Sequence, residues 1–495
     1  MADVSQTHPD YDKMLPDWDL VRDAIEGESA VKDQGDVYLP KPSGFTAQED
    51  GGAKMYNAYQ LRAKFPEIMG PSIRGMVGVI HRVAADIELP TQLEPMFEMA
   101  TKDGQSLSAL HERITYELLA TGRYGLLVDA PADGEGDLPY IAGYKAETII
   151  NWSVDSDFFV LDETRLVRDG FQWDEVEQYR VLKLGEDDSQ DPNAPPGVYT
   201  QQVFEGESEG EILKPTMRGG GSLEEIPFVV VGSTDVAADV DEIPLMGVAR
   251  AAFTMFRLDA DYKWQLFMSG QETLFVYSDT DAPVQVVGAS VVINLPSGSK
   301  AEYIGPSGKT IEAHKQAIID ERNQAVAAGA RIFDTEKKAQ ESGEALKIRF
   351  AAQTATLTSI AINSAKGLER ALKFCALFVG ADPDQVVVKP NLQFIDTILD
   401  PKDAKALMEM WMGGAISKQT LDENLQRGGI RSYERTFEEE AELIDEEIPD
   451  LNTPQIARED QKMQQAQENA VQVAKAAPKL VPVQGGRKPA PFQKK

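Results

Sequence analysis

The chain has 495 residues but a single cysteine, which excludes a disulfide framework and a cysteine-based zinc site. Its four histidines, His8, His81, His111 and His314, are scattered along the sequence and leave little room for a histidine metal cluster. Basic residues are also scarce, 49 against 81 acidic ones, so the net charge is −32. A chain this acidic is a poor candidate for wrapping DNA by neutralising its phosphates.

Long apolar runs are absent as well. Stretches such as 226–231 are far shorter than the roughly 18 residues that a membrane-spanning helix needs, so no membrane partner is expected. The first ten residues, MADVSQTHPD, contain neither a basic region nor an apolar run, so no signal peptide is expected. The expected setting is a reducing cytoplasm or a particle assembled in one.

The order of predicted elements carries more information than the composition. The first 50 residues hold 12 acids and 4 bases, and they predict an extended arm with one short helix. Ser106 begins and Gly122 ends a clean amphipathic helix, and LLVDAP after it predicts a buried strand. Residues 138–231 are rich in β-branched and aromatic residues and predict a succession of strands.

The third quarter predicts a helical hairpin. A helix is expected over 244–269, then a β-rich patch, then a second helix over 309–333. The two helices would form a hairpin with the β module at its tip, and such a rod has so little core that it must pack against copies of itself or against partners. An ordinary α+β domain with a long hairpin is the alternative.

A polar segment, DTEKKAQESGE, separates the hairpin from a third helix over 345–379, roughly 50 Å long, with Gly367 as a plausible bend point. Pro390 makes the following strand an edge strand or a broken one. Helices return over 402–447, and the tail combines a Gln-rich helix with the basic sequence GGRKPAPFQKK.

The chemical motifs are weak. IGPSGKT (304–310) lies between a strand and a helix, but it lacks the first glycine of a phosphate loop, so a turn that opens a helix is favoured over a nucleotide hydrolase. GESEG (206–210) matches the esterase GxSxG pattern only within an acidic loop. His111 has no second histidine at metal-ligand spacing, and Cys375 lies on an apolar helix face. We find no catalytic constellation and expect neither an enzyme nor a cofactor.

The order of long sequence blocks resembles the portal proteins of tailed bacteriophages, the ring-shaped head-to-tail connectors, and in particular a portal-like family catalogued as a domain of unknown function. The resemblance covers about residues 50–400. The blocks that carry it are YNAYQLRAKF, IELP, DGQSLSALHERITYELLATGRYGLLVDAP, PYIAGYKAETIINW, IPLMGVARAAFTMFRLDADYKWQLFMSGQETLFV and LKIRFAAQTATLTSIAINSAKGLERALKF.

The resemblance implies an α+β portal fold assembled as a ring, usually of twelve copies, around an axial channel. Its implied parts are an acidic arm (1–50), a wing (51–243), stem helices (244–270 and 307–333), a clip (271–306), a tunnel loop (334–344), a long wing helix with a returning strand (345–401), a helical crown (402–450) and a Gln-rich helix with a basic tail (451–495).

The resemblance also implies partners and sites. The partners are further copies of the chain, double-stranded DNA passing without sequence specificity, the terminase large subunit, a head-tail adaptor, and the capsid and scaffolding proteins, in a virion assembled in the host cytoplasm. The implied channel residues are Lys337, Lys338, Gln340, Ser342 and Gly343, and the implied clip docking residues are Asp279, Asp281, Ser297 and Lys300. For the two tunnel-loop lysines, a solvated loop is the alternative, and for the whole chain it is another virion structural or adaptor protein.

Overall fold

A computed structural model describes the fold in two units, residues 1–394 and 395–495. The described residues are 4–46, 50–130, 138–185, 197–206, 208–218, 220–270, 273–277, 298–304, 310–327, 329, 343–392, 394, 401–427, 430–431 and 435–451. The chain mixes helices with antiparallel sheets, which confirms the α+β class predicted from the sequence.

The N-terminal segment is helical and packed, so the prediction of an extended arm with one short helix is wrong. It forms α1 (Pro9–Glu26), α2 (Glu28–Asp33) and the short 3-10 turns η1 (Gly35–Val37) and η2 (Ser43–Phe45). Trp18, Val21 and Val31 are fully buried, and the Trp18 indole donates to the backbone carbonyl of Thr121, 3.1 Å away. Its aromatic and aliphatic side chains therefore belong to the main core.

Helices and turns of the first unit follow. They are α3 (Ala53–Arg62), α4 (Met69–Ile80), η3 (Thr91–Phe97), α5 (Leu107–Thr121) and η4 (Ala146–Thr148). The Ser106 hydroxyl caps α5, and Gly122 ends it with a φ of 77°, as the sequence predicts.

Antiparallel strands make up much of the rest of the first unit. The three-stranded sheet has the order β11 (Phe228–Gly232), β2 (Arg123–Asp129), β3 (Tyr140–Lys145). The five-stranded sheet has the order β10 (Ser208–Glu209), β9 (Tyr199–Glu205), β8 (Gln178–Leu184), β5 (Phe158–Asp162), β4 (Ile149–Trp152). Two small pairs also belong to this unit, β6 (Arg165–Asp169) with β7 (Gln172–Val176), and β1 (Asp86–Glu88) with β14 (Val387–Lys389).

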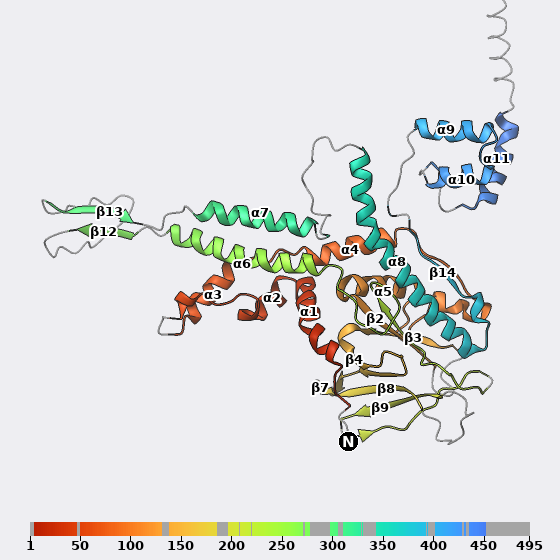
Figure 1. Cartoon of the computed structure of the whole chain (residues 1–495), viewed down its shortest axis with the longest axis horizontal. Coiled ribbons are helices and arrows are strands. Elements are labelled where there is room, and N and C mark those ends of the chain that lie inside the picture. The colour runs from red at the N-terminus through yellow and green to blue at the C-terminus, as the bar shows by residue number, and fades with distance from the viewer. Residues whose placement is uncertain are drawn as a thin grey trace, which may run out of the picture. The chain divides into compact units, whose positions relative to one another are not determined.

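Three helices and one strand pair form the segment after β11. They are α6 (Met246–Ser269), β12 (Thr273–Tyr277), β13 (Lys300–Ile304), α7 (Ile311–Ala327) and α8 (Gly343–Val379), with η7 (Pro383–Gln385) after them. α6 and α7 pack along each other, and β12 and β13 form an antiparallel pair between them in the chain (Figure 1). This confirms the predicted order of helix, β module, helix and long helix.

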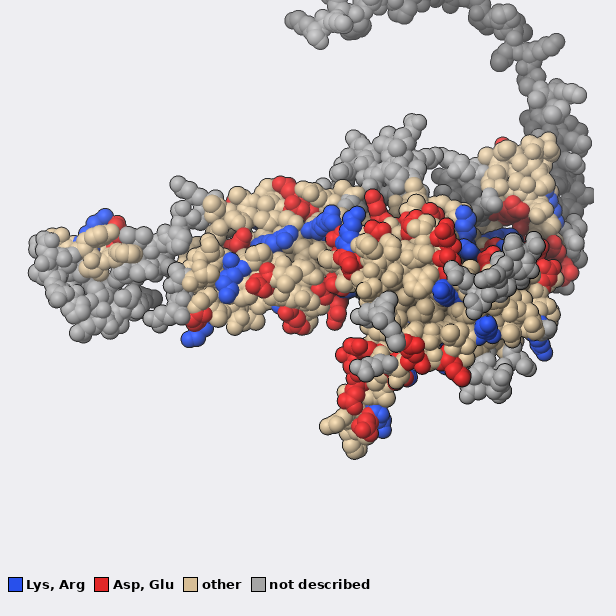
Figure 2. Space-filling model, turned by 60° about the horizontal axis from the view of Figure 1, so that its bottom comes forward, with Lys and Arg blue, Asp and Glu red and all other residues tan. Residues whose placement is uncertain are grey.

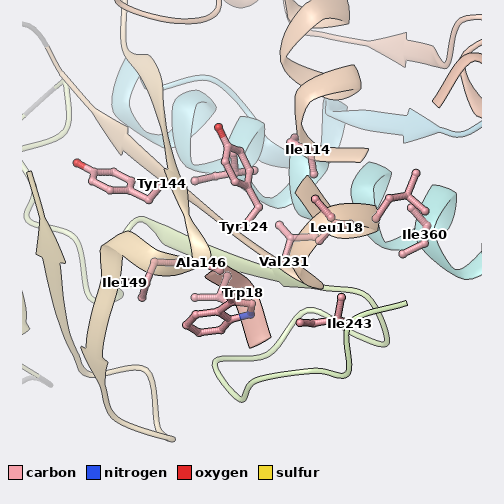
Figure 3. Packing of buried hydrophobic residues seen from close by; sticks show 14 of the residues in the cluster. Trp18, Ile114, Leu118, Tyr124, Tyr144, Ala146, Ile149, Val231, Ile243 and Ile360 are labelled. Atoms are coloured by element: carbon pink, nitrogen blue, oxygen red, sulfur yellow. The ribbon is translucent and has the colours of Figure 1, made fainter. Parts of the chain in front are cut away.

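The core of this unit lies where α1, α5 and α8 meet the three-stranded sheet. Figure 3 shows Trp18 of α1 beside Ala146 and Ile149, with Val231 of β11 between them and Leu118 of α5. Burial of these large apolar side chains supplies the driving force for packing helices onto the sheet.

The second unit contains α9 (Pro401–Met412), α10 (Lys418–Arg427) and α11 (Phe437–Leu451). The predicted helices over 402–447 are thus confirmed. Arg431 is almost fully buried here, and it pairs with Asp422 at 2.7 Å and donates to the backbone carbonyl of Arg435. The Gln-rich helix and the basic tail lie outside the described residues.

Candidate functional site

The candidate site is the α6–β12–β13–α7 hairpin, and its base is anchored in the core. Val248, Ala252 and Phe256, at helical spacing on α6, are completely buried. At the other end of the helix, Leu266 and Phe267 are partly exposed. α6 is about 36 Å long at 1.5 Å per residue, so it carries the strand pair well away from its buried end.

An aromatic cluster supports the C-terminal half of α6. The Tyr59 hydroxyl donates to the carboxylate of Asp261 at 2.6 Å, and burial together with that carboxylate raises the Tyr59 pKa well above its usual range. The Trp264 ring lies 6.0 Å from that of Tyr59 and 5.1 Å from that of Phe45, between ring centroids. The Arg62 guanidinium lies 3.9 Å from the centroid of the Phe267 ring on α6, a cation–π contact. Phe45, Tyr59 and Arg62 therefore hold the C-terminal half of the helix.

α7 is tied to α6 at both of its ends. Before its first turn, the Thr310 hydroxyl donates to the Gln265 side-chain oxygen at 2.7 Å. Near its last turn Ala325 is buried, and Gly329, with a φ of 135°, lies against Leu245 just before α6. The two helices are held in an antiparallel hairpin.

Of the implied clip docking residues, the structure describes only Lys300, which lies in the strand pair at the tip. Lys300 pairs in register with Tyr277, and its ammonium lies 2.8 Å from the Glu302 carboxylate. The hydrogen bond and the charge of Lys300 lower the Glu302 pKa. Asp279, Asp281 and Ser297 lie outside the described residues.

The implied channel residues are almost all outside the described part of the chain. Lys337, Lys338, Gln340 and Ser342 belong to residues 330–342, which the structure does not describe. Gly343 is the first residue of α8. The structure therefore does not bring the implied channel and clip residues together.

α8 lies on the three-stranded sheet. Gly367 faces Val231 of β11, and a Cβ at Gly367 would lie 2.9 Å from Val231 Cγ1. The helix is continuous through this glycine, so its observed role is close packing onto the sheet. The side-chain amide of Asn363 donates to the Ser233 carbonyl at 3.0 Å, and Cys375 is buried as predicted, with desolvation raising its pKa.

A contact between a buried histidine and a half-buried one was missed by the sequence analysis. His81, at the end of α4, and His111, on α5, pack edge to face with their ring centroids 4.7 Å apart. His111 Nε2 lies 3.2 Å from the Ser364 hydroxyl of α8, and burial, helped by His81, lowers its pKa to about 3. Burial also lowers the His81 pKa. Thirty residues separate the two in sequence, so no local motif marks them.

The remaining motifs occur in surface elements. Ser208 of GESEG lies in the short exposed strand β10, beside a glycine with a φ of 57°. In IGPSGKT, Ile304 ends β13 and α7 begins at Ile311, while 305–309 lie outside the described residues. Among the described residues, no three acidic, histidine or cysteine side chains gather closely enough to hold a metal ion. Within the same residues, no helix combines the length and apolarity needed to cross a bilayer.

Comparison with known proteins gives one family match. A family model described as "Domain of unknown function (DUF4055)" matches residues 244–379, the segment from just before α6 to the end of α8. A search of curated protein sequences finds no match.

Several solved structures are distantly similar. A chain from "Virion of native gene transfer agent (GTA) particle" has a TM-score of 0.42 at 14% identity, covering 80% of this chain and 96% of its own. A chain from "Neck of empty GTA particle computed with C6 symmetry" has 0.39 at 14%, covering 82% and 99%. A chain from "Neck of native GTA particle computed with C12 symmetry" has 0.36 at 14%, covering 72% and 89%. These TM-scores are below 0.5, so the functional argument rests on the hairpin and its anchoring.

Proposed function

We propose that this chain is a phage portal protein, which forms a ring at one capsid vertex and provides the channel for DNA packaging and ejection. The observation that carries the proposal is the order of α6, β12, β13, α7 and α8 along the chain. It reproduces the order of stem, clip, stem and long wing helix that the sequence resemblance implies. The matched family segment, 244–379, contains this same series.

The hairpin also has the mechanical features that a ring subunit needs. The base of α6 is fixed in the core by Val248 and Phe256. Its C-terminal half is held by the ring contact between Trp264 and Tyr59. The tip therefore extends from a rigid base and can present β12 and β13 to the packaging motor and the tail adaptor. The tunnel loop would comprise residues 334–342, because the implied range of 334–344 overlaps α8, which begins at Gly343.

Charge is consistent with a conduit. Each copy carries −32, so a ring of twelve carries about −384 by simple multiplication. An anionic assembly repels phosphates and lets a duplex slide, whereas release of counterions on binding would slow it. The lysines at 337 and 338 would make only transient phosphate contacts.

Electron microscopy with class averaging of the purified full chain tests the proposal. Rings with a central hole and about twelve-fold symmetry are expected, and mass measurement should give about 650 kDa for twelve copies of the 54.4 kDa chain. Compact particles without a hole, both alone and after co-expression with a scaffolding protein, would contradict it.

A second measurement tests the channel. Deleting residues 336–343 should leave ring assembly intact and reduce DNA packaging or retention. If the ring is lost instead, the segment is structural and the assignment of a tunnel loop is wrong.

A further inference from the structure

The β6–β7 ribbon, residues 165–176, projects from the five-stranded sheet without covering anything. Among the described residues its two strands pair only with each other, and Gly170 turns between them with a φ of 61°. All strand residues are exposed except Val176, which is half-buried. An isolated two-stranded hairpin is marginally stable in water, so a ribbon like this gains stability from a partner.

One face of the ribbon combines large apolar side chains with one basic and one acidic residue. Leu166 is 64% exposed, Trp173 is 61% exposed, and Phe171 in the turn is completely exposed at 101%. The register pairs Leu166 with Glu175 and Arg168 with Trp173, so Leu166 and Trp173 share a face. Each large aromatic side chain carries about 150–250 Å² of surface. Exposed apolar patches of several hundred Å² are typical of interaction sites.

The charges around this face identify the class of partner. Arg168 and Glu175 lie on it, and the whole ribbon carries two basic and three acidic residues. A nucleic acid or an anionic membrane would be recognised by a surface of one sign. The mixture fits a protein surface that itself carries both signs, and both are interspersed over the face of this molecule shown in Figure 2.

The same chain offers a groove with that character. A cavity of about 880 Å³ opens between α5 and β3, and Ala109, Tyr116 and Ile141 are among the residues that line it. Two bases and two acids also line it, Lys102, Asp103, Glu112 and Arg113. The ribbon face, with two large apolar side chains, an arginine and a glutamate, can therefore meet apolar side chains and charges of opposite sign in the groove.

We propose that the β6–β7 ribbon of one copy docks in the α5–β3 groove of the next copy. Because ribbon and groove are different surfaces of one chain, the contact is head-to-tail, and a head-to-tail contact closes into a ring when its rotation allows. The inference rests on the proposed function and deepens it by naming an interface between neighbouring subunits.

Disulfide trapping in the full chain tests the contact. The native Cys375 is buried and does not compete, so Phe171→Cys combined with Ala109→Cys introduces the only accessible thiols of the described residues. After mild oxidation we expect dimers and longer ladders on a non-reducing gel, with the 171–109 linkage identified by mass spectrometry. Val154→Cys with Ala109→Cys is the matched control, because Val154 is also largely exposed but lies outside the ribbon.

A second variant measures the energetic effect. Phe171→Ser with Trp173→Ser should weaken association of the copies by roughly 10- to 100-fold for each buried aromatic residue. Val154→Ser should leave association unchanged. Far-UV circular dichroism should be unaltered in all variants, since the ribbon contributes nothing to the core.

The outcomes separate this inference from the proposed function. If the wild type forms rings but the double cysteine variant gives no 171–109 cross-link, or if the double serine variant forms unchanged rings, the ribbon contact is overturned and the portal function stands. Cross-linked ladders without closed rings support the contact and contradict the portal. A ribbon that cross-links only to other proteins overturns the contact between copies.

Discussion

The substitution Gly367→Ala tests how α8 is held on the sheet. In the structure, the new methyl group would lie well inside contact distance of Val231 Cγ2, 2.9 Å from Cγ1 and 3.1 Å from Cβ. Val231 is fully buried and β-branched, so its side chain has no open space to rotate into. Either α8 moves away from β11 or the core around Val231 rearranges.

Two effects of opposite sign decide the result. Replacing glycine by alanine inside a helix stabilises the helix by about 1 kcal/mol. Overpacking a well-packed core costs about 1–3 kcal/mol, and three close atoms of one rigid side chain place this site in the upper part of that range. We expect Gly367→Ala to lower the free energy of unfolding by about 1–2 kcal/mol.

Gly78→Ala is the matched control. Gly78 is also inside a helix, α4, but it is exposed and nothing lies within 4 Å of its hypothetical Cβ, so the same change should raise the free energy of unfolding by up to about 1 kcal/mol. Urea unfolding followed by circular dichroism should shift the two midpoints in opposite directions. A Gly367→Ala midpoint at or above that of the wild type would refute the close packing of α8 on Val231.

Three further predictions concern the buried core and the hydrogen bond between Tyr59 and α6. Burial and a neighbouring histidine hold the pKa of His111 at about 3, below its ordinary 6.5, so the stability present above pH 6.5 should fall by up to about 1.4 kcal/mol per pH unit below it. His111→Gln should flatten this loss in acid unfolding curves. Trp18→Ala should lower the free energy of unfolding by about 3–5 kcal/mol and Leu61→Ala by less than about 0.5 kcal/mol, both measured with urea, because only the first is buried. Tyr59→Phe removes the hydrogen bond that braces α6, at a cost of about 1–2 kcal/mol, and should speed tryptic cleavage within α6, while unchanged cleavage would argue against the brace.

Elements with strong local signals could be predicted from the sequence. α5 has a serine cap, an apolar stripe and a terminal glycine, and the structure begins and ends it there. α6, α7 and α8 were predicted because apolar residues recur at helical spacing over many turns, which fixes the element type whatever the tertiary context. The hairpin of the candidate site follows from these local signals alone.

Contacts between distant parts of the chain could not be predicted in this way. The Tyr59 hydroxyl and the Asp261 carboxylate are 202 residues apart, and the His81–His111 pair forms only because α4 and α5 pack together. On α3, likewise, Leu61 is exposed, while Tyr59 is buried against α6. Periodicity identifies a helix, and the tertiary fold selects the face that is buried.

The N-terminal segment shows where composition misleads. Its six acidic residues on α1 suggested a solvated arm, and the structure leaves none of them buried, so composition did predict where the charges lie. However, Tyr11, Trp18, Val21 and Ala24 are spaced by seven, three and three residues. They form a narrow buried stripe that packs α1 against the core. The Arg22 guanidinium contacts the fully buried carboxylate of Glu117 at 2.6 Å, which binds α1 to α5. Removing one partner of a buried ion pair costs about 3–5 kcal/mol. A few well-spaced side chains and one buried ion pair therefore outweigh the average polarity of an acidic segment.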